Sequence, residues 1–347
     1  MGDQGPPHAG ETPRTTPLPS TGPGRADAPA DQKPFRVLSV DGGGFLGLAS
    51  AAFIAGIEAH TGRPLAGSFD LFCGTSTGAI ISLALAYGKS GEELVDLYET
   101  LGDRVFRRKG RGWLSAKYPS DPLRAVLTEQ FGATTLGDLH ANRKATLVTA
   151  LNLTTGTPRV FKTDHSANLS RDNGLRLVDI AMASTAAPTF FPVVRLENPG
   201  DRLREEFCDA GVVANHPALL GFVEALEEFK VPPGQVRVLS IATPRCELGE
   251  GAASKRCRDR GRVAWLCSRS FPSLFIDSGS MVAHQILRRI VASYQHPCPR
   301  YERIEMANPD RLRMDEVTMR SKQILTHCGR TAAADNTVRR RVSSILN

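Results

Sequence analysis

A serine between two glycines has the residue types and spacing of an activated nucleophile. The segment Gly74–Gly78 (GTSTG) fits the pattern G-x-S-x-G and lies between a short apolar run at 69–73 and an apolar segment at 77–87. In that setting a sharp strand-to-helix turn exposes the serine hydroxyl, and the glycines avoid clashes in the turn. The helix that follows adds positive potential where negative charge develops. We therefore predict that Ser76 attacks ester carbonyls; the alternative is a serine that only caps a buried helix.

Three consecutive glycines after the first apolar run offer amide donors for a developing negative charge. Gly42, Gly43 and Gly44 follow the run at 35–40, and consecutive glycine amides can converge on one point as an oxyanion hole. The same stretch, Gly42–Gly47, also fits G-x-G-x-x-G, which binds dinucleotide phosphates. Dinucleotide binding requires an acidic residue at the end of the second strand, where this sequence has the serine motif. We favour the oxyanion hole and keep dinucleotide binding as its rival.

The base that such a serine requires is not fixed by residue spacing. Asp209 follows a short apolar stretch and precedes Ala210 and Gly211, which places a carboxylate at a strand end, where α/β enzymes gather catalytic groups. His216 comes close behind it. The other candidate histidines after the serine stand in no distinctive motif: His140, His165, His284, His296 and His327. From the residues alone, aspartate and histidine both remain open as the base.

Four motifs together resemble the ordered signatures of the patatin-like phospholipase family. They lie at Asp41–Gly47, Gly74–Gly78, Ala183–Pro192 and Asp209–Gly211, within residues 35–245. The resemblance implies an α/β fold, namely the patatin-like three-layer sandwich with a mostly parallel central sheet and a nucleophile elbow. It implies no metal and no cofactor.

The resemblance also implies roles for the site residues. Ser76 would be the nucleophile and Asp209 its general base, in a Ser-Asp dyad that forms an acyl-enzyme without any histidine. The amides of Gly42, Gly43 and Gly44 would form the oxyanion hole. An aspartate with the ordinary pKa of about 4 is a weak base, so the dyad requires a partly dry site that raises this pKa. The motifs are supported by the further glycines Gly74, Gly78 and Gly211.

The activity implied by the resemblance is hydrolysis of the acyl esters of membrane phospholipids, of the phospholipase A type. The size and the basic C-terminal part are similar to bacterial anti-phage effectors of this family, which degrade the cell's own membrane once a cyclic nucleotide binds. Leu46 departs from the family pattern, because it stands where the glycine motif usually has Arg or Lys and thus removes a positive charge. A nucleotide-binding regulator and a catalytically inactive scaffold remain as alternatives.

Composition limits the compartment and the partners. Of 347 residues, 41% are hydrophobic and 23% charged, as in water-soluble globular proteins, and the net charge of +7 favours acidic partners. Seven cysteines without a paired framework indicate a reducing compartment. We expect a cytoplasmic protein that is peripheral at the inner membrane when active. Its expected partners are a phospholipid surface and a cyclic oligonucleotide activator. The sequence is also compatible with a homo-oligomer, and we expect no nucleic acid polymer as a partner.

The elements that must position these residues alternate between strand and helix. Apolar runs predict strands at 35–40, 69–73, 145–151, 159–162 and 236–242, with helices between them, which is typical of a parallel sheet. We expect a disordered leader at 1–33, a catalytic domain at 34–245, and a basic, mostly helical extension at 246–347 packed on the same domain. Basic residues in 104–113, 256–262 and 339–341 would suit a phosphate-rich ligand or an anionic bilayer.

Overall fold

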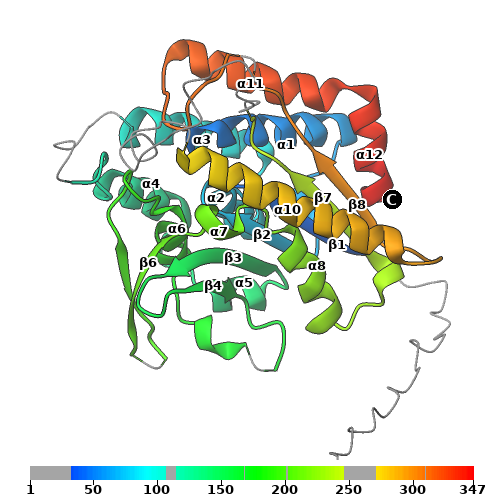
Figure 1. Ribbon diagram of the computed structural model, residues 1–347, viewed down its shortest axis with the longest axis horizontal. Coiled ribbons are helices and arrows are strands. Elements are labelled where there is room, and N and C mark those ends of the chain that lie inside the picture. The colour runs from blue at the N-terminus through cyan, green and yellow to red at the C-terminus, as the bar shows by residue number, and fades with distance from the viewer. Residues whose placement is uncertain (1–32, 107–114, 168, 201, 246–270, 309) are drawn as a thin grey trace, which may run out of the picture. The chain divides into compact units, whose positions relative to one another are not determined.

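The two strand–turn–helix units lie side by side at the centre of a mostly parallel sheet (Figure 1). In the described part of the chain this sheet has eight strands in the order β5-β6-β3-β2-β1-β7-β8, with β4 paired to β3. The strands β1, β2, β3, β7 and β8 are parallel, whereas β4 and β6 each pair antiparallel with β3, and β5 pairs antiparallel with β6. The strands are β1 (Phe35–Val40), β2 (Leu71–Thr75), β3 (Ala145–Asn152), β4 (Thr157–Lys162), β5 (Val194–Glu197), β6 (Arg204–Asp209), β7 (Val236–Ile241) and β8 (Arg300–Ile304).

The computed structural model describes residues 33–106, 115–167, 169–200, 202–245, 271–308 and 310–347. Within them, Lys33–Asn347 is one compact unit. The expected leader lies outside the described residues except for Lys33, as do the basic residues expected at 256–262 and most of the basic stretch at 104–113.

Helices cover both faces of the sheet, because its central strands are apolar on both sides. Leu38 and Phe72 belong to one buried cluster, while Val37 and Leu71 belong to a second cluster on the opposite face. The first cluster is packed against α1 (Gly47–Thr61), α2 (Thr77–Tyr87), α3 (Gly91–Val105), α4 (Asp121–Phe131), α5 (Leu136–Ala141), α6 (Leu177–Thr185), α11 (Met319–Ala334) and α12 (Asn336–Leu346). The second is packed against α8 (Ala218–Glu227) and α10 (Phe271–Ser293). These layers confirm the predicted three-layer α/β fold.

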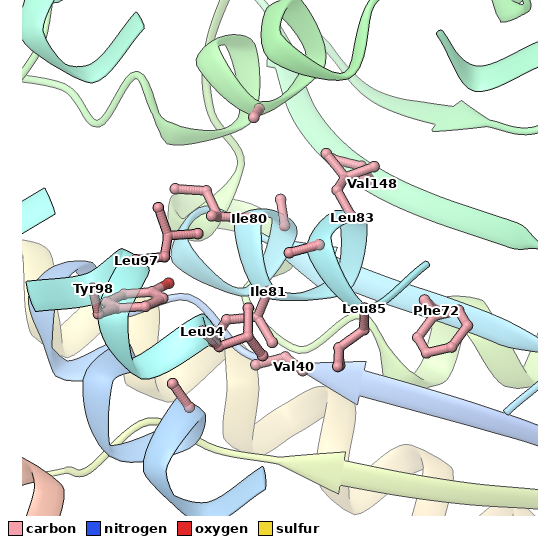
Figure 2. Packing of buried hydrophobic residues seen from close by; sticks show 14 of the residues in the cluster. Val40, Phe72, Ile80, Ile81, Leu83, Leu85, Leu94, Leu97, Tyr98 and Val148 are labelled. Carbon is pink, nitrogen blue, oxygen red and sulfur yellow. The ribbon is translucent and has the colours of Figure 1, made fainter. Parts of the chain in front are cut away.

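Helix α2, which begins directly after Ser76, is buried on every side. Figure 2 shows Ile81 beside Leu94 of α3 and Val40 of β1, while Leu83 points toward Val148 of β3. A helix enclosed in this way cannot shift without opening the core, since protein interiors are packed as densely as organic crystals. The packing therefore fixes the position of the helix start.

The C-terminal residues complete the sheet and cover α1. Strand β8 pairs with β7, although the sequence analysis singled out no strand in the mostly helical extension after residue 245. Its sequence, RYERI, has three charged residues among five on an edge strand and lacks the continuous apolar run of a central strand. Helix α11 lies against α1, where Gly329 approaches the backbone: a Cβ at this position would lie 2.2 Å from the carbonyl oxygen of Ala49. The boundary placed at residue 245 stays a prediction.

One segment has the length and composition of a membrane span. Gly44–Thr61 has a mean hydropathy of 1.2 over 18 residues, but 67% of this window is buried inside the structure. The helix packs against α3 and α11, so its apolar residues form part of the core. The sequence analysis did not single out this segment.

We predict that Gly329→Ala destabilises the fold by about 1–3 kcal/mol, because the added methyl group meets backbone atoms of α1 that cannot move aside. Gly279→Ala is the matched control, since Gly279 also lies inside a helix but nothing stands within 4 Å of an added Cβ. This control should raise stability by about 0.5–1 kcal/mol. Urea denaturation measures both changes, and equal effects of the two substitutions would contradict the close packing of α11 on α1.

Candidate active site

Ser76 occupies a strained turn between β2 and α2. Its φ of 55° and ψ of −125° are unusual for a residue with a side chain. Two glycines permit the turn: a Cβ on Gly74 would lie 2.3 Å from the carbonyl oxygen of Gly78, and one on Gly78 would lie 2.1 Å from that of Val40. The turn presents the Ser76 side chain at the start of a helix, as the G-x-S-x-G pattern predicts.

The Ser76 backbone is held by a serine from the third motif. The Ser76 amide donates to Oγ of Ser184 at 2.9 Å, and the Ser184 hydroxyl donates to the carbonyl oxygen of Thr149 at 2.7 Å. Ser184 lies in α6 and is fully buried. The sequence analysis placed this residue in a family motif without giving it a role; its role is to support the turn.

Asp209 ends β6 beside Ser76. The Ser76 side chain and the Asp209 carboxylate both line one cavity, and the Gly211 amide donates to Oδ1 of Asp209 at 2.7 Å. Burial raises the pKa of Asp209 to about 6, although the neighbouring Ser76 hydroxyl and the Gly211 amide oppose this shift. A carboxylate with this pKa accepts a proton more readily than an ordinary aspartate, yet it is still largely ionised at pH 7. The structure thus brings together the two residues that the sequence predicted as a dyad.

Two of the three predicted oxyanion-hole glycines line the cavity that contains Ser76. These are Gly43 and Gly44, and within the described residues their amides donate to no other group of the chain. Gly42 does not line the cavity; its carbonyl oxygen accepts from the Thr243 hydroxyl at 2.8 Å and from the Asn215 side-chain amide at 3.4 Å. Gly43 and Gly44 therefore lie at the cavity with amides that are available to an oxyanion.

The same loop is poorly suited to a dinucleotide. The Phe45 amide donates to the carbonyl oxygen of Met314 at 2.7 Å, so it is not available to a phosphate. Gly44 has a φ of +59°, and a Cβ there would lie 2.4 Å from the same carbonyl oxygen. Leu46, which replaces the usual basic residue of the family, packs into the core and does not line the cavity. These contacts favour an oxyanion hole over a dinucleotide-binding site at the glycine loop.

An apolar cavity of about 490 Å³ adjoins both Ser76 and Asp209. Its surface is formed almost entirely by hydrophobic side chains, with few polar groups besides the two predicted catalytic residues. Most of its walls come from Phe45, Ile80, Leu101, Val105, Phe106, Leu123, Phe190, Phe191, Val212, Ile276 and Met314. Such a surface binds a hydrocarbon chain well and a charged group poorly.

A buried ionic cluster lies just before the glycine loop. Asp41 is fully buried, and Arg303 of β8 donates to its Oδ2 at 2.6 Å, while Arg245 donates to the same oxygen at 2.9 Å. Burial raises the pKa of Asp41, but Arg303 and His216 outweigh this effect and hold the pKa well below its usual range. The carboxylate is therefore a charged structural anchor for the end of β1.

None of the six candidate histidines lines the described cavity. His216 comes nearest to having a role, because Arg303 donates to its Nδ1 at 2.7 Å and Asp41 lies 3.2 Å from the same atom. Burial lowers the pKa of His216, so the ring is neutral near pH 7. It belongs to the ionic cluster, and the histidine alternative for the base loses its support. No group of three potential metal ligands occurs among the described residues.

Several residues at the site were missed by the sequence analysis. Asn215 and Thr243 hold the Gly42 carbonyl oxygen, Met314 closes one side of the glycine loop, and Arg303 neutralises Asp41. Asn215 lies close behind the Asp209 motif, and this proximity was the only local signal. The others come from distant segments that carry no recognisable pattern.

The pKa of Asp209 generates a prediction about the reactivity of Ser76. Labelling of Ser76 by a fluorophosphonate should slow as the pH falls through about 6, because protonated Asp209 cannot accept the serine proton. Intact-protein mass spectrometry measures the labelling rate at each pH. In Asp209→Asn the rate should be low and independent of pH over this range. A wild-type midpoint of about 4, the value of an ordinary aspartate, would contradict the effect of burial.

Comparison with known proteins places this geometry in a family. The sequence profile described as "Patatin-like phospholipase" matches residues 38–221. A "cGAMP-activated phospholipase" of Pseudomonas aeruginosa is 35% identical over 311 residues, which cover 86% of this chain and 88% of that protein. Another of Escherichia coli is 35% identical over 237 residues, which cover 63% of this chain and 65% of that protein.

A solved structure shares the fold. The crystal structure of VipD from Legionella pneumophila aligns with 90% of this chain and 67% of its own, with a TM-score of 0.51 and 13% sequence identity. At this identity the likeness concerns the fold alone. The profile match over more than half of the chain and the 35% identity to the Pseudomonas aeruginosa relative, of which 88% is covered, go further. Together they show that this chain belongs to the patatin-like phospholipase family.

Proposed function

We propose that this protein hydrolyses acyl esters of membrane phospholipids through a Ser76–Asp209 dyad. The observation that carries the proposal is that Ser76, in its strained turn, and a buried Asp209 lie together at the wall of an apolar cavity. The serine supplies a nucleophile, the aspartate supplies a base, and the cavity supplies a place for an acyl chain. Membership of the family and the names of the relatives support the same activity.

The proposed reaction has two steps that use the same residues. Asp209 accepts the hydroxyl proton as Oγ of Ser76 attacks the ester carbonyl carbon, and the amides of Gly43 and Gly44 stabilise the oxyanion. Collapse breaks the ester bond, and Asp209 returns the proton to the leaving alkoxide of the lysophospholipid. Water then attacks the acyl-enzyme while Asp209 again accepts a proton, and the fatty acid leaves as Ser76 recovers its hydrogen.

We further propose that a cyclic oligonucleotide activates this protein. The relatives from Pseudomonas aeruginosa and Escherichia coli are both named as cGAMP-activated phospholipases. The net charge of +7 suits a ligand that carries phosphates. Such an enzyme would act from the cytoplasm on the inner membrane as an anti-phage effector, and its dependence on a signal would protect the membrane of an uninfected cell.

Release of free fatty acid from phospholipid vesicles tests the dyad. With cGAMP present, Ser76→Ala should abolish release, and Asp209→Asn should lower the rate about 10²- to 10⁴-fold, because the isosteric amide cannot act as a base. Ser82→Ala is the matched control: Ser82 lies in the same helix and is fully buried, but it does not line the cavity, and it should retain activity.

The same assay separates the proposed function from its alternatives. Wild-type protein should release fatty acid only in the presence of one member of a panel of cyclic di- and trinucleotides that includes cGAMP. Release without any nucleotide would agree with hydrolysis by the dyad and contradict activation by a cyclic nucleotide. Full activity of Ser76→Ala would contradict the dyad. Binding of a nucleotide with no ester hydrolysis under any condition would favour a nucleotide-binding regulator.

The apolar cavity predicts a dependence on acyl-chain length. For water-soluble p-nitrophenyl esters, kcat/KM should rise about fourfold for each added CH₂, since burying this group is worth about 0.8 kcal/mol. A spectrophotometric series from acetate to octanoate measures the trend. Rates that do not change with chain length would show that the acyl group does not enter the cavity.

A further inference from the structure

The outer face of α10 carries an exposed apolar stripe. Met281, Val282 and Ile286 are 50%, 59% and 44% exposed, whereas Leu287, on the opposite side of the helix, is fully buried in the cluster below. Helix α10 runs across the front of the sheet, and its outer side is uncovered by any described element (Figure 1). Exposed apolar residues that gather on one helix face are a recognised mark of an interaction surface.

This stripe adjoins the cavity that contains Ser76. Ile276, which lies in α10 shortly before Met281, lines the cavity. Helix α7 (Gly211–Ala214) packs against α10, and it places Val212 in the cavity wall while its neighbour Val213 is 53% exposed. Both helices therefore contribute one apolar residue to the cavity wall and carry exposed apolar residues close to it in the sequence.

Positive charge lies at the C-terminal end of the stripe. Arg288 and Arg289 follow Met281 and Val282 by seven residues, which is two helical turns, so they lie on the same face. Both arginines are exposed, and neither forms an ion pair with any described residue. Apolar residues with adjacent arginines on one helix face are the arrangement by which peripheral helices bind anionic lipid.

We propose that the face formed by Met281, Val282, Ile286, Arg288 and Arg289, here called the α10 face, docks the protein on an anionic phospholipid bilayer. The inference rests on the proposed function, because a lipid hydrolase must receive its substrate from a bilayer. The apolar side chains enter the acyl region of the outermost lipids, and the arginines contact head-group phosphates. An acyl chain then passes from the bilayer into the adjacent cavity.

Vesicle flotation tests the docking in a Ser76→Ala background, in which no lipid is consumed. The vesicles are made of phosphatidylcholine alone or of equal parts phosphatidylcholine and phosphatidylglycerol, with cGAMP present. The triple variant Met281→Ser, Val282→Ser, Ile286→Ser should lower the partition coefficient on the mixed vesicles by about tenfold or more. The pair Arg288→Gln, Arg289→Gln should weaken binding to the mixed vesicles and leave binding to phosphatidylcholine unchanged.

A matched control removes exposed apolar residues elsewhere. Leu153 is 43% exposed after β3, and Met319 is 72% exposed at the start of α11, which packs on the other face of the sheet. The pair Leu153→Ser, Met319→Ser should bind vesicles as the parent does. Equal vesicle binding by this pair and by the triple variant would overturn the proposal, and the single variant Val282→Ser repeats the test with the least disturbance of the helix.

Activity assays in the wild-type background distinguish failure of the docking surface from failure of the proposed function. The triple variant should hydrolyse p-nitrophenyl butyrate at the parental rate and release about tenfold less fatty acid from the mixed vesicles. If the triple variant retains both activities, the docking surface is overturned and the proposed function stands. If the wild type hydrolyses no ester, the function fails while flotation still decides the docking. A stable dimer that the triple variant converts to a monomer, with unchanged flotation, would assign the α10 face to a second copy of the chain instead.

Discussion

The arrangement of the candidate active site depends on one buried charge, the carboxylate of Asp41. Asp41 stands at the end of β1, directly before the glycine loop, and Arg303 of β8 neutralises it across 262 positions of sequence. Loss of the charged partner of a buried carboxylate destabilises the fold by several kcal/mol. The ion pair therefore holds together β1 and β8, which are the first and the last strand along the chain. His216, from the segment that follows Asp209, joins the same cluster. Three separate parts of the chain thus meet beside the candidate catalytic residues.

The strained serine turn depends on a different kind of constraint, which is close backbone contact. Gly78 lies against the carbonyl oxygen of Val40, so α2 can approach β1 only if this position has no side chain. The buried Ser184 then satisfies the Ser76 amide. Packing and one hydrogen bond together maintain a φ that an isolated serine rarely adopts. The strain is confined to one residue, and the surrounding core keeps that residue in place.

Local patterns located the candidate catalytic residues and the central strands, but they did not reveal the structure that supports the site. The glycine spacing around Ser76 and the strand-end position of Asp209 are visible in short windows, and so are the apolar runs of the central strands. Strand β8 was missed because an edge strand that contains charged residues has no continuous apolar run. Arg303 and Met314 were missed because a contact between distant segments leaves no periodic signal in either of them. Leu46 showed the opposite problem: its motif position suggested a place near the site, but its apolar side chain packs in the core.

The contacts of Arg303 and Met314 have a consequence for the synthesis of the protein. Both residues lie in the last fifth of the chain, and they complete the surroundings of a glycine loop that lies near its beginning. While the ribosome is still translating the C-terminal segment, Asp41 has no Arg303 to neutralise it and the loop is not closed by Met314. We therefore expect that a nascent chain completes the site only after translation has passed these residues.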